Sequence, residues 1–139
     1  MRFALSPEQI DFAASVRKLL DAGRTPAAVR AWAKDDSLPG RTLIQQLAGA
    51  GVLGLAVDEA YGGVGAEPID LVVAFVEIGR SAAPGPLVET AAAIPVLLQS
   101  LPDSAAAERW LPGLAEGTAL GTVAFATPGV DPIALDADV

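Results

Sequence analysis

The chain has 139 residues, 52% of them hydrophobic and 19% charged, a composition that predicts a folded domain rather than a disordered segment. Its formal net charge of -8 and nine scattered basic residues argue against a nucleic-acid-binding surface. With no cysteine and no histidine, disulfides, thiolate metal sites and Ser-His catalysis are excluded within this sequence, and we predict no metal site. No stretch has the apolar pattern of a signal peptide or a membrane span, so a cytoplasmic location is expected.

The first predicted helix begins at a strong N-terminal signal. Ser6 is placed to cap it, Pro7 suits the first helical position, and Gln9 occupies the position of a capping-box partner. The pattern continues at helical spacing to about Ala22, through Ile10, Ala13, Val16 and Leu20. A second, shorter helix is expected over 25–33, with a cap at its first residue.

A third and a fourth helix follow. Leu38-Pro39-Gly40 is typical of a turn, and the apolar spacing after it predicts a helix that ends at Gly51. Glu67-Pro68 starts the fourth helix, which is apolar on nearly every side and is therefore expected to be buried within a bundle. Asp70 and Glu77 share a face of this helix. They are candidates for an acid-base pair, or more simply Asp70 complements the positive end of the helix.

The stretch between these two helices is rich in glycine. Its apolar residues are expected to form a buried plug inside a packed connector: Val52, Leu53, Leu55 and Val57. Tyr61 would anchor that packing. The alternative is a phosphate cradle made by the backbone N–H groups of 62–65, although no nucleotide-binding spacing is met there.

The remaining sequence predicts two helices, followed by a change from the helical spacing of apolar residues to a strand-like run. A helix over 87–100 should be kinked or split by Pro95, and a short helix from Ser104 should end at Leu111-Pro112-Gly113. Residues 120–125 are typical of a buried strand. The predicted fold is all-α, an orthogonal or up-and-down bundle of about five to six helices, followed by the first strand or two of a β-domain.

The order of several separated motifs resembles the N-terminal helical domain of the flavin-dependent acyl-CoA dehydrogenase family. The motifs are Leu5-Ser6-Pro7-Glu8-Gln9, the run from Gly51 to Gly65, Glu77-Ile78-Gly79-Arg80, the run from Arg109 to Gly117, and Pro128-Gly129 after a strand. The resemblance covers about Phe3 to Gly117. It implies a helical domain over 1–118 and the start of a middle β-domain over 119–139.

The resemblance implies an enzyme that introduces an α,β double bond into an acyl-CoA thioester. In this family a carboxylate removes the α proton and FAD, bound between subunits, accepts the hydride from the β carbon. The base is usually a glutamate beyond Val139, so we assign no catalytic residue to this chain. We expect a fragment or part of a split or heteromeric enzyme, a homo- or hetero-oligomer with another acyl-CoA dehydrogenase subunit.

One departure concerns the flavin motif. Alignment on Pro128-Gly129 puts Ala126, Thr127 and Pro132 where the family has threonine, glutamate and serine. Hydroxyl contacts would be lost here, while the backbone of Phe125, Ala126 and Thr127 could still contact FAD. This pattern resembles subunits of actinobacterial heteromeric enzymes of lipid breakdown, some of which act on sterol side chains. The alternative function is a non-catalytic helical subunit or interaction module that has lost flavin contacts.

The acyl slot of the family lies against the fourth and fifth helices. We therefore expect Leu87, Thr90 and Ala91 to line it, the alternative being that they are ordinary core residues. Small side chains at this place would suit a bulky or polycyclic acyl group.

Overall fold

Six α-helices make up most of residues 4–124, the part of the chain described by the structure, a computed structural model. They are α1 (Pro7–Ala22), α2 (Thr25–Trp32), α3 (Leu38–Gly49), α4 (Pro68–Ser81), α5 (Ile94–Ser100) and α6 (Ala105–Ala115). Two 3-10 turns, η1 (Val52–Gly54) and η2 (Glu59–Tyr61), connect α3 to α4, and the π-helical turn η3 (Glu89–Ala93) leads into α5. The predicted all-α class and the number of helices are confirmed.

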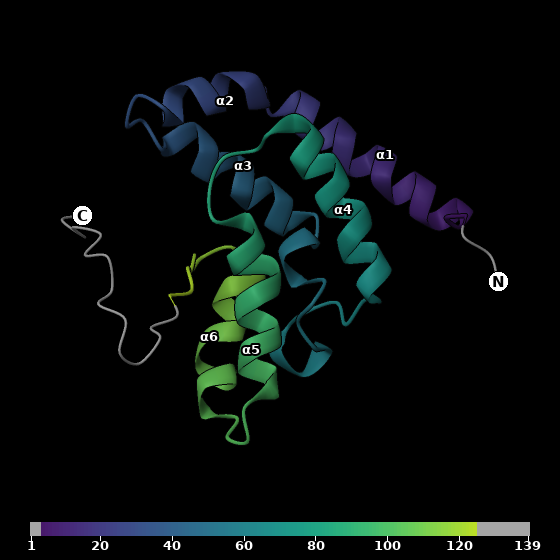
Figure 1. The fold of residues 1–139 in the computed structure, drawn as a ribbon, viewed down its shortest axis with the longest axis vertical. Coiled ribbons are helices and arrows are strands. Elements are labelled where there is room, and N and C mark those ends of the chain that lie inside the picture. Colours follow the sequence, from purple (N-terminus) through teal and green to yellow (C-terminus); the bar gives the residue numbers. More distant parts are fainter. Residues whose placement is uncertain (1–3, 125–139) are drawn as a thin grey trace, which may run out of the picture.

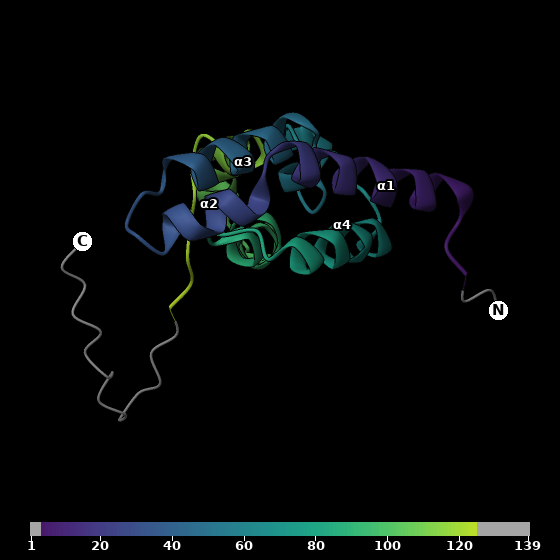
Figure 2. The same cartoon turned by 90° about the horizontal axis from the view of Figure 1, so that it is seen from above.

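The helices are arranged in layers. Seen from above, α1, α2 and α3 lie in one layer, and α4 lies in a second layer beneath them (Figure 2). α4 packs against α1, α2 against α3, and α5 pairs with α6 to form the narrow end opposite α2 (Figure 1). No helix among the described residues combines the length and the apolar character that a membrane crossing would require.

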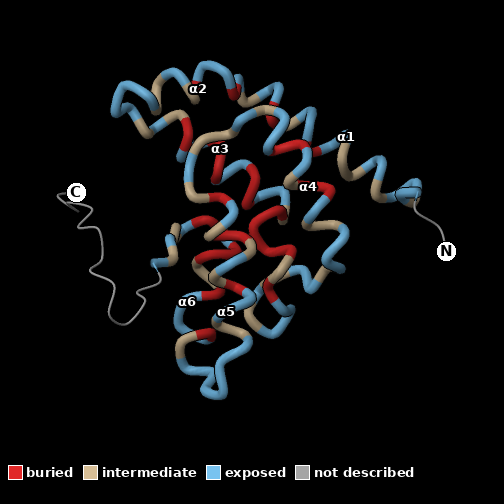
Figure 3. The backbone as a smooth tube through the Cα atoms, viewed as in Figure 1, coloured by how far each residue is buried: buried red, intermediate tan, exposed pale blue. Residues whose placement is uncertain are grey.

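The hydrophobic core follows α3 and the connector after it, as the buried segments of the tube show (Figure 3). Val52, Leu53 and Val57 are each 0% exposed, so the plug predicted from the sequence is confirmed. A second, smaller cluster is built on Leu111 and Leu114 of α6, with Tyr61 packed against it. The connector is therefore a structural part of the domain.

The start of α1 is built by the signal found in the sequence. The N–H of Gln9 donates to the Ser6 hydroxyl at 3.2 Å, and the N–H of Ser6 donates to the Gln9 side-chain carbonyl at 3.0 Å. This reciprocal pair satisfies backbone donors that a helix start leaves without partners. The Gln9 amide group also donates to Asp70 at 3.3 Å, which ties the start of α1 to the start of α4.

Two predicted helix boundaries were wrong. Thr25 does not cap α2, because its hydroxyl donates to the Leu20 carbonyl at 2.7 Å, and Arg24 occupies the cap position with φ 51°. The turn expected at 38–40 lies inside α3. Proline is tolerated in the first turn of a helix, and Gly40 lets the Trp32 ring pack against the α3 backbone.

The end of α6 and the strand after it also differ from the prediction. α6 continues through Pro112 to Ala115, because Leu111 and Leu114 on its inner face are buried at 0% and 2% exposure. Residues 120–124 form no strand. A strand needs a neighbour for its backbone hydrogen bonds, and none exists within 4–124. Phe125 lies outside the described residues.

The prediction that α4 is buried on nearly every side was wrong for its outer face. Val73, Ala74 and Ile78 point inward and are at most 5% exposed, whereas Ile69, Val72 and Val76 are 40%, 56% and 55% exposed. The inward face of α4 packs against α1 and joins residues of α3 in the main core.

Candidate functional site

The glycine-rich connector does not form an anion site, because its backbone donors are used within the connector itself. The N–H of Gly63 donates to the Asp58 carbonyl at 3.1 Å, that of Val64 to Gly54 at 2.9 Å and that of Gly65 to Val57 at 2.9 Å. A phosphate cradle needs such groups to point outward. The geometry therefore favours the packed connector over the phosphate alternative.

A pocket of about 420 Å³ lies where α4 ends and η3 begins. Most of its walls are apolar, and four of its residues are glycine or alanine. Its lining residues are Phe75, Ile78, Gly79, Ala82, Ala83, Gly85, Leu87, Val88 and Glu89. A concave apolar site with few polar groups is the ordinary form of a small-molecule site.

Local backbone geometry shapes this pocket. Ala82 ends α4 in the left-handed region with φ 53°, and its N–H donates to the Gly79 carbonyl at 3.0 Å. Gly85 has φ 110°, a conformation that side chains resist, and there the chain turns into η3. These two positions turn the chain back, so that Leu87 and Val88 come to face the last turn of α4.

The π-helical turn that follows is explained by Pro95. Proline has no N–H and its ring crowds the carbonyl four residues earlier, so a regular helix cannot pass through it without adjustment. The turn is widened instead: the N–H of Ile94 donates to the Glu89 carbonyl, five residues earlier. The predicted split at Pro95 is confirmed, and the wide turn lies directly beside the pocket.

The three residues predicted to contact the acyl group do not all reach this pocket. Leu87 lines it and is 3% exposed. Thr90 and Ala91 are 0% exposed and do not line it, and Ala91 belongs to the main hydrophobic core. The Thr90 hydroxyl donates to the Gly121 carbonyl at 3.3 Å and accepts from the Gly121 N–H at 3.2 Å. Phe125, Ala126 and Thr127, predicted to contact FAD, lie outside the described residues.

The small residues of the wall were not singled out from the sequence. Gly79, Ala82, Ala83 and Gly85 gather at the end of an apolar helix, and this concentration of small side chains next to a turn was the available signal. Sequence spacing alone does not tell whether such residues allow close packing or leave a space. The three-dimensional structure assigns them to the pocket.

The two carboxylates considered as an acid-base pair have separate structural partners. Asp70 accepts from the N–H of Glu67 at 3.2 Å and from Gln9. Glu77 accepts two hydrogen bonds from Arg17, at 2.8 and 2.7 Å, and these bonds lower the pKa of the Glu77 carboxyl below its usual value. Each carboxylate fixes α1 to α4, so the geometry does not support joint acid-base work.

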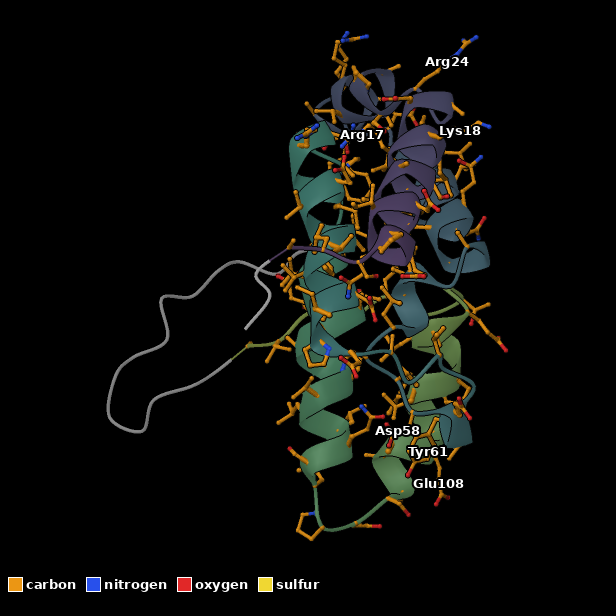
Figure 4. All side chains as sticks on the ribbon, turned by 90° about the vertical axis from the view of Figure 1, so that its right-hand side faces the viewer. Arg17, Lys18, Arg24, Asp58, Tyr61 and Glu108 are labelled. Atoms are coloured by element: carbon orange, nitrogen blue, oxygen red, sulfur yellow. The ribbon has the colours of Figure 1, made fainter. Side chains whose placement is uncertain are left out.

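Charged side chains lie at both ends of the molecule. Arg17, Lys18 and Arg24 lie at the end formed by α1 and α2, whereas Asp58 and Glu108 lie with Tyr61 at the opposite end (Figure 4). Among the described residues, no group of three or more acidic side chains could hold a metal ion. The apolar pocket at the end of α4 is taken as the candidate functional site.

Comparisons with known proteins match the sequence to one family and to a relative. Residues 6–118 match the family described as acyl-CoA dehydrogenase, N-terminal domain. The chain is 34% identical over 115 residues to acyl-CoA dehydrogenase IpdE2 of Mycolicibacterium smegmatis. That match covers 80% of this chain but 34% of the relative, so the chain spans about a third of the relative's length.

Proposed function

The chain belongs to the acyl-CoA dehydrogenase family through its N-terminal domain, and from this premise we propose that it forms part of an enzyme that desaturates an acyl-CoA thioester. The observation that carries the proposal is the apolar pocket at the end of α4. In the same proposal the protein acts in the cytoplasm, in lipid or steroid breakdown.

The pocket suits the acyl group of such a substrate. Leu87 and Phe75 supply apolar surface, and burying apolar surface contributes about 25 cal/mol per Å². Thr90, next to Glu89 of the wall, is buried and hydrogen bonds through its hydroxyl to both the N–H and the carbonyl of Gly121. These residues would bind and orient the acyl chain and keep water from the carbons that react.

The cofactor of the proposed reaction is FAD, which when bound supplies the acceptor for the two electrons removed from the substrate. The residues proposed to contact it are Phe125, Ala126 and Thr127, through their backbone. No residue of 4–124 is assigned to FAD binding. The carboxylate that removes the α proton is proposed to lie outside this chain. The enzyme would therefore be completed by further domains or by another acyl-CoA dehydrogenase subunit.

The domain boundary belongs to the proposal as well. Residues 1–118 would form the helical domain, and 119–139 would begin a β-domain whose first strand takes its pairing partners from outside 4–124. Thr90 hydrogen bonds to Gly121 near this boundary, which ties residue 121 to η3.

The proposal is tested by the absorption spectrum of the purified chain, alone and together with an acyl-CoA dehydrogenase subunit of the same genome. We expect a complex with flavin absorption bands that bleach when an acyl-CoA is added without oxygen. Val88→Trp, at a lining residue that is 57% exposed, should fill the pocket and slow the bleaching, while the control Leu38→Trp, at a residue that is 71% exposed, should not. A stable complex that takes up no flavin would instead support the non-catalytic subunit.

A further inference from the structure

Gly121 is held in place although it belongs to no helix. The hydroxyl of Thr90 accepts a hydrogen bond from the Gly121 N–H at 3.2 Å and donates one to the Gly121 carbonyl at 3.3 Å. A Cβ added to Gly121 would overlap Cδ1 of Ile94, so the backbone lies directly against that side chain. Residue 121 is therefore fixed to the domain both by hydrogen bonds and by packing.

Both residues that hold Gly121 belong to the wide turn that contributes to the pocket wall. Thr90 lies within η3, next to the lining residue Glu89, and Ile94 directly follows η3. The N–H of Ile94 donates to the Glu89 carbonyl, which closes the turn. The position of Gly121 is therefore set relative to the wall that Leu87 and Glu89 help to form.

The hydroxyl of Thr90 is explained by its bonds to Gly121 and not by packing. Thr90 is 0% exposed, and a buried hydroxyl is costly unless it is hydrogen-bonded. The next three residues of the turn, 91–93, are all alanine. A valine at position 90 would have nearly the same shape and would need no partner, so the polar group serves to hold the Gly121 backbone.

We infer that Thr90 is a positioning residue for the proposed dehydrogenase. Through Gly121 it fixes the start of the segment that leads to the proposed flavin contacts, relative to the wall of the acyl pocket. This inference rests on the proposed function. Phe125, the first of those proposed contacts, comes four residues after Gly121, and four residues span at most about 14 Å. A shift of Gly121 would therefore be passed on to the backbone that is proposed to meet FAD.

The test measures FAD affinity by fluorescence titration of the complex between this chain and the acyl-CoA dehydrogenase subunit that completes it. We expect Thr90→Val to raise the Kd for FAD at least about tenfold, which corresponds to about 1.4 kcal/mol. Thr90→Ser keeps the hydroxyl and should stay within about threefold of the wild type. The amide NMR signal of Gly121 should move in Thr90→Val and return toward its wild-type position in Thr90→Ser.

Thr25→Val is the matched control. Thr25 is also buried, at 1% exposure, and its hydroxyl donates to the Leu20 carbonyl at 2.7 Å, where α1 meets α2. Each valine variant removes a buried hydroxyl that is hydrogen-bonded to the backbone, so the Tm should fall in both. The affinity for FAD should change in Thr90→Val only, which separates a positioning role from a general loss of stability.

An unchanged FAD affinity in Thr90→Val, an equal change in Thr25→Val, or no rescue by Thr90→Ser would overturn the inference. Failure of the proposed function gives a different result. A complex whose FAD affinity depends on Thr90, but whose flavin no acyl-CoA reduces, would sink the proposed dehydrogenase and leave the positioning role. A wild-type complex that takes up no FAD would overturn both.

Discussion

Arg17 of α1 and Glu77 of α4 form a two-contact ion pair, with Nε to Oε2 at 2.8 Å and Nη2 to Oε1 at 2.7 Å. The Glu77 side chain is 5% exposed and that of Arg17 is 49% exposed. The ion pair therefore fixes one face of α4 on α1.

Because of this ion pair, the free energy of unfolding should depend on pH in the acidic range. The folded pKa of Glu77 is lowered because Arg17 hydrogen bonds to its charged form, so the contribution to stability is complete above the unfolded pKa of about 4.3. This contribution to stability is lost as the pH falls through the lower pKa that Glu77 has in the folded protein. The raised pKa of Arg17 adds no change in this range. We expect the urea midpoints of wild type and Glu77→Gln to differ at pH 7 and to converge below pH 4. Parallel curves would contradict this role.

The second core should be sensitive to truncation at Leu111. This side chain is 0% exposed and packs with Leu114, Val57 and Ala107. Leu111→Ala should lower the free energy of unfolding by about 2–5 kcal/mol, since it removes buried methyl groups and leaves a cavity. Chemical denaturation measures the change. Leu97→Ala, on a side chain that is 41% exposed, should cost far less, and an equal loss would show that Leu111 is not a core anchor.

Thr90 should hold the backbone of Gly121, near the end of the helical domain, in place. Thr90→Val removes the hydroxyl that both donates to and accepts from the Gly121 backbone, at a cost of about 1–3 kcal/mol for the groups left unpaired. The Gly121 amide should then exchange with solvent faster, as hydrogen-deuterium exchange measures. Thr90→Ser keeps the hydroxyl and should keep the protection. Unchanged exchange in Thr90→Val would refute the assignment.

Local signals in the sequence predicted the start of α1, whereas contacts with distant segments decide where α6 ends. Ser6 and Gln9 cap α1 as expected, because a capping box depends on residues that are near one another in the chain. α6 continues past Pro112 because Leu111 and Leu114 are buried against segments that are distant in the chain. The residues next to Pro112 in the sequence do not reveal these contacts.

The residues that line the pocket could be predicted from the sequence only in part. Leu87 was singled out and lines it, whereas Thr90 was singled out with it and is 0% exposed without lining it. Which of these side chains faces the space depends on the π-helical turn next to Pro95.

The left-handed conformation of Ala82 predicts a stabilising substitution. A residue with a Cβ is strained at φ 53°, by roughly 1 kcal/mol, and glycine is not. Ala82→Gly should therefore raise the free energy of unfolding by about 0.5 kcal/mol, after the greater entropy of glycine in the unfolded chain is subtracted. Ala27→Gly, within α2, should lower it by up to about 1 kcal/mol. An equal decrease in the free energy of unfolding in the two variants would show that Ala82 is not strained.

Gly40 and Gly49 form a matched pair in α3 on which the packing of Trp32 can be tested. A Cβ on Gly40 would lie 2.5 Å from Cε3 of Trp32, so Gly40→Ala must push the ring aside, which typically costs about 1–3 kcal/mol. Gly49→Ala meets no atom within 4 Å and should be neutral or stabilising. Trp32 fluorescence, measured in a Trp110→Phe background, should shift toward the solvent-exposed emission for Gly40→Ala only. Emission that stays unchanged, with stability intact, would mean that the ring does not rest on the α3 backbone.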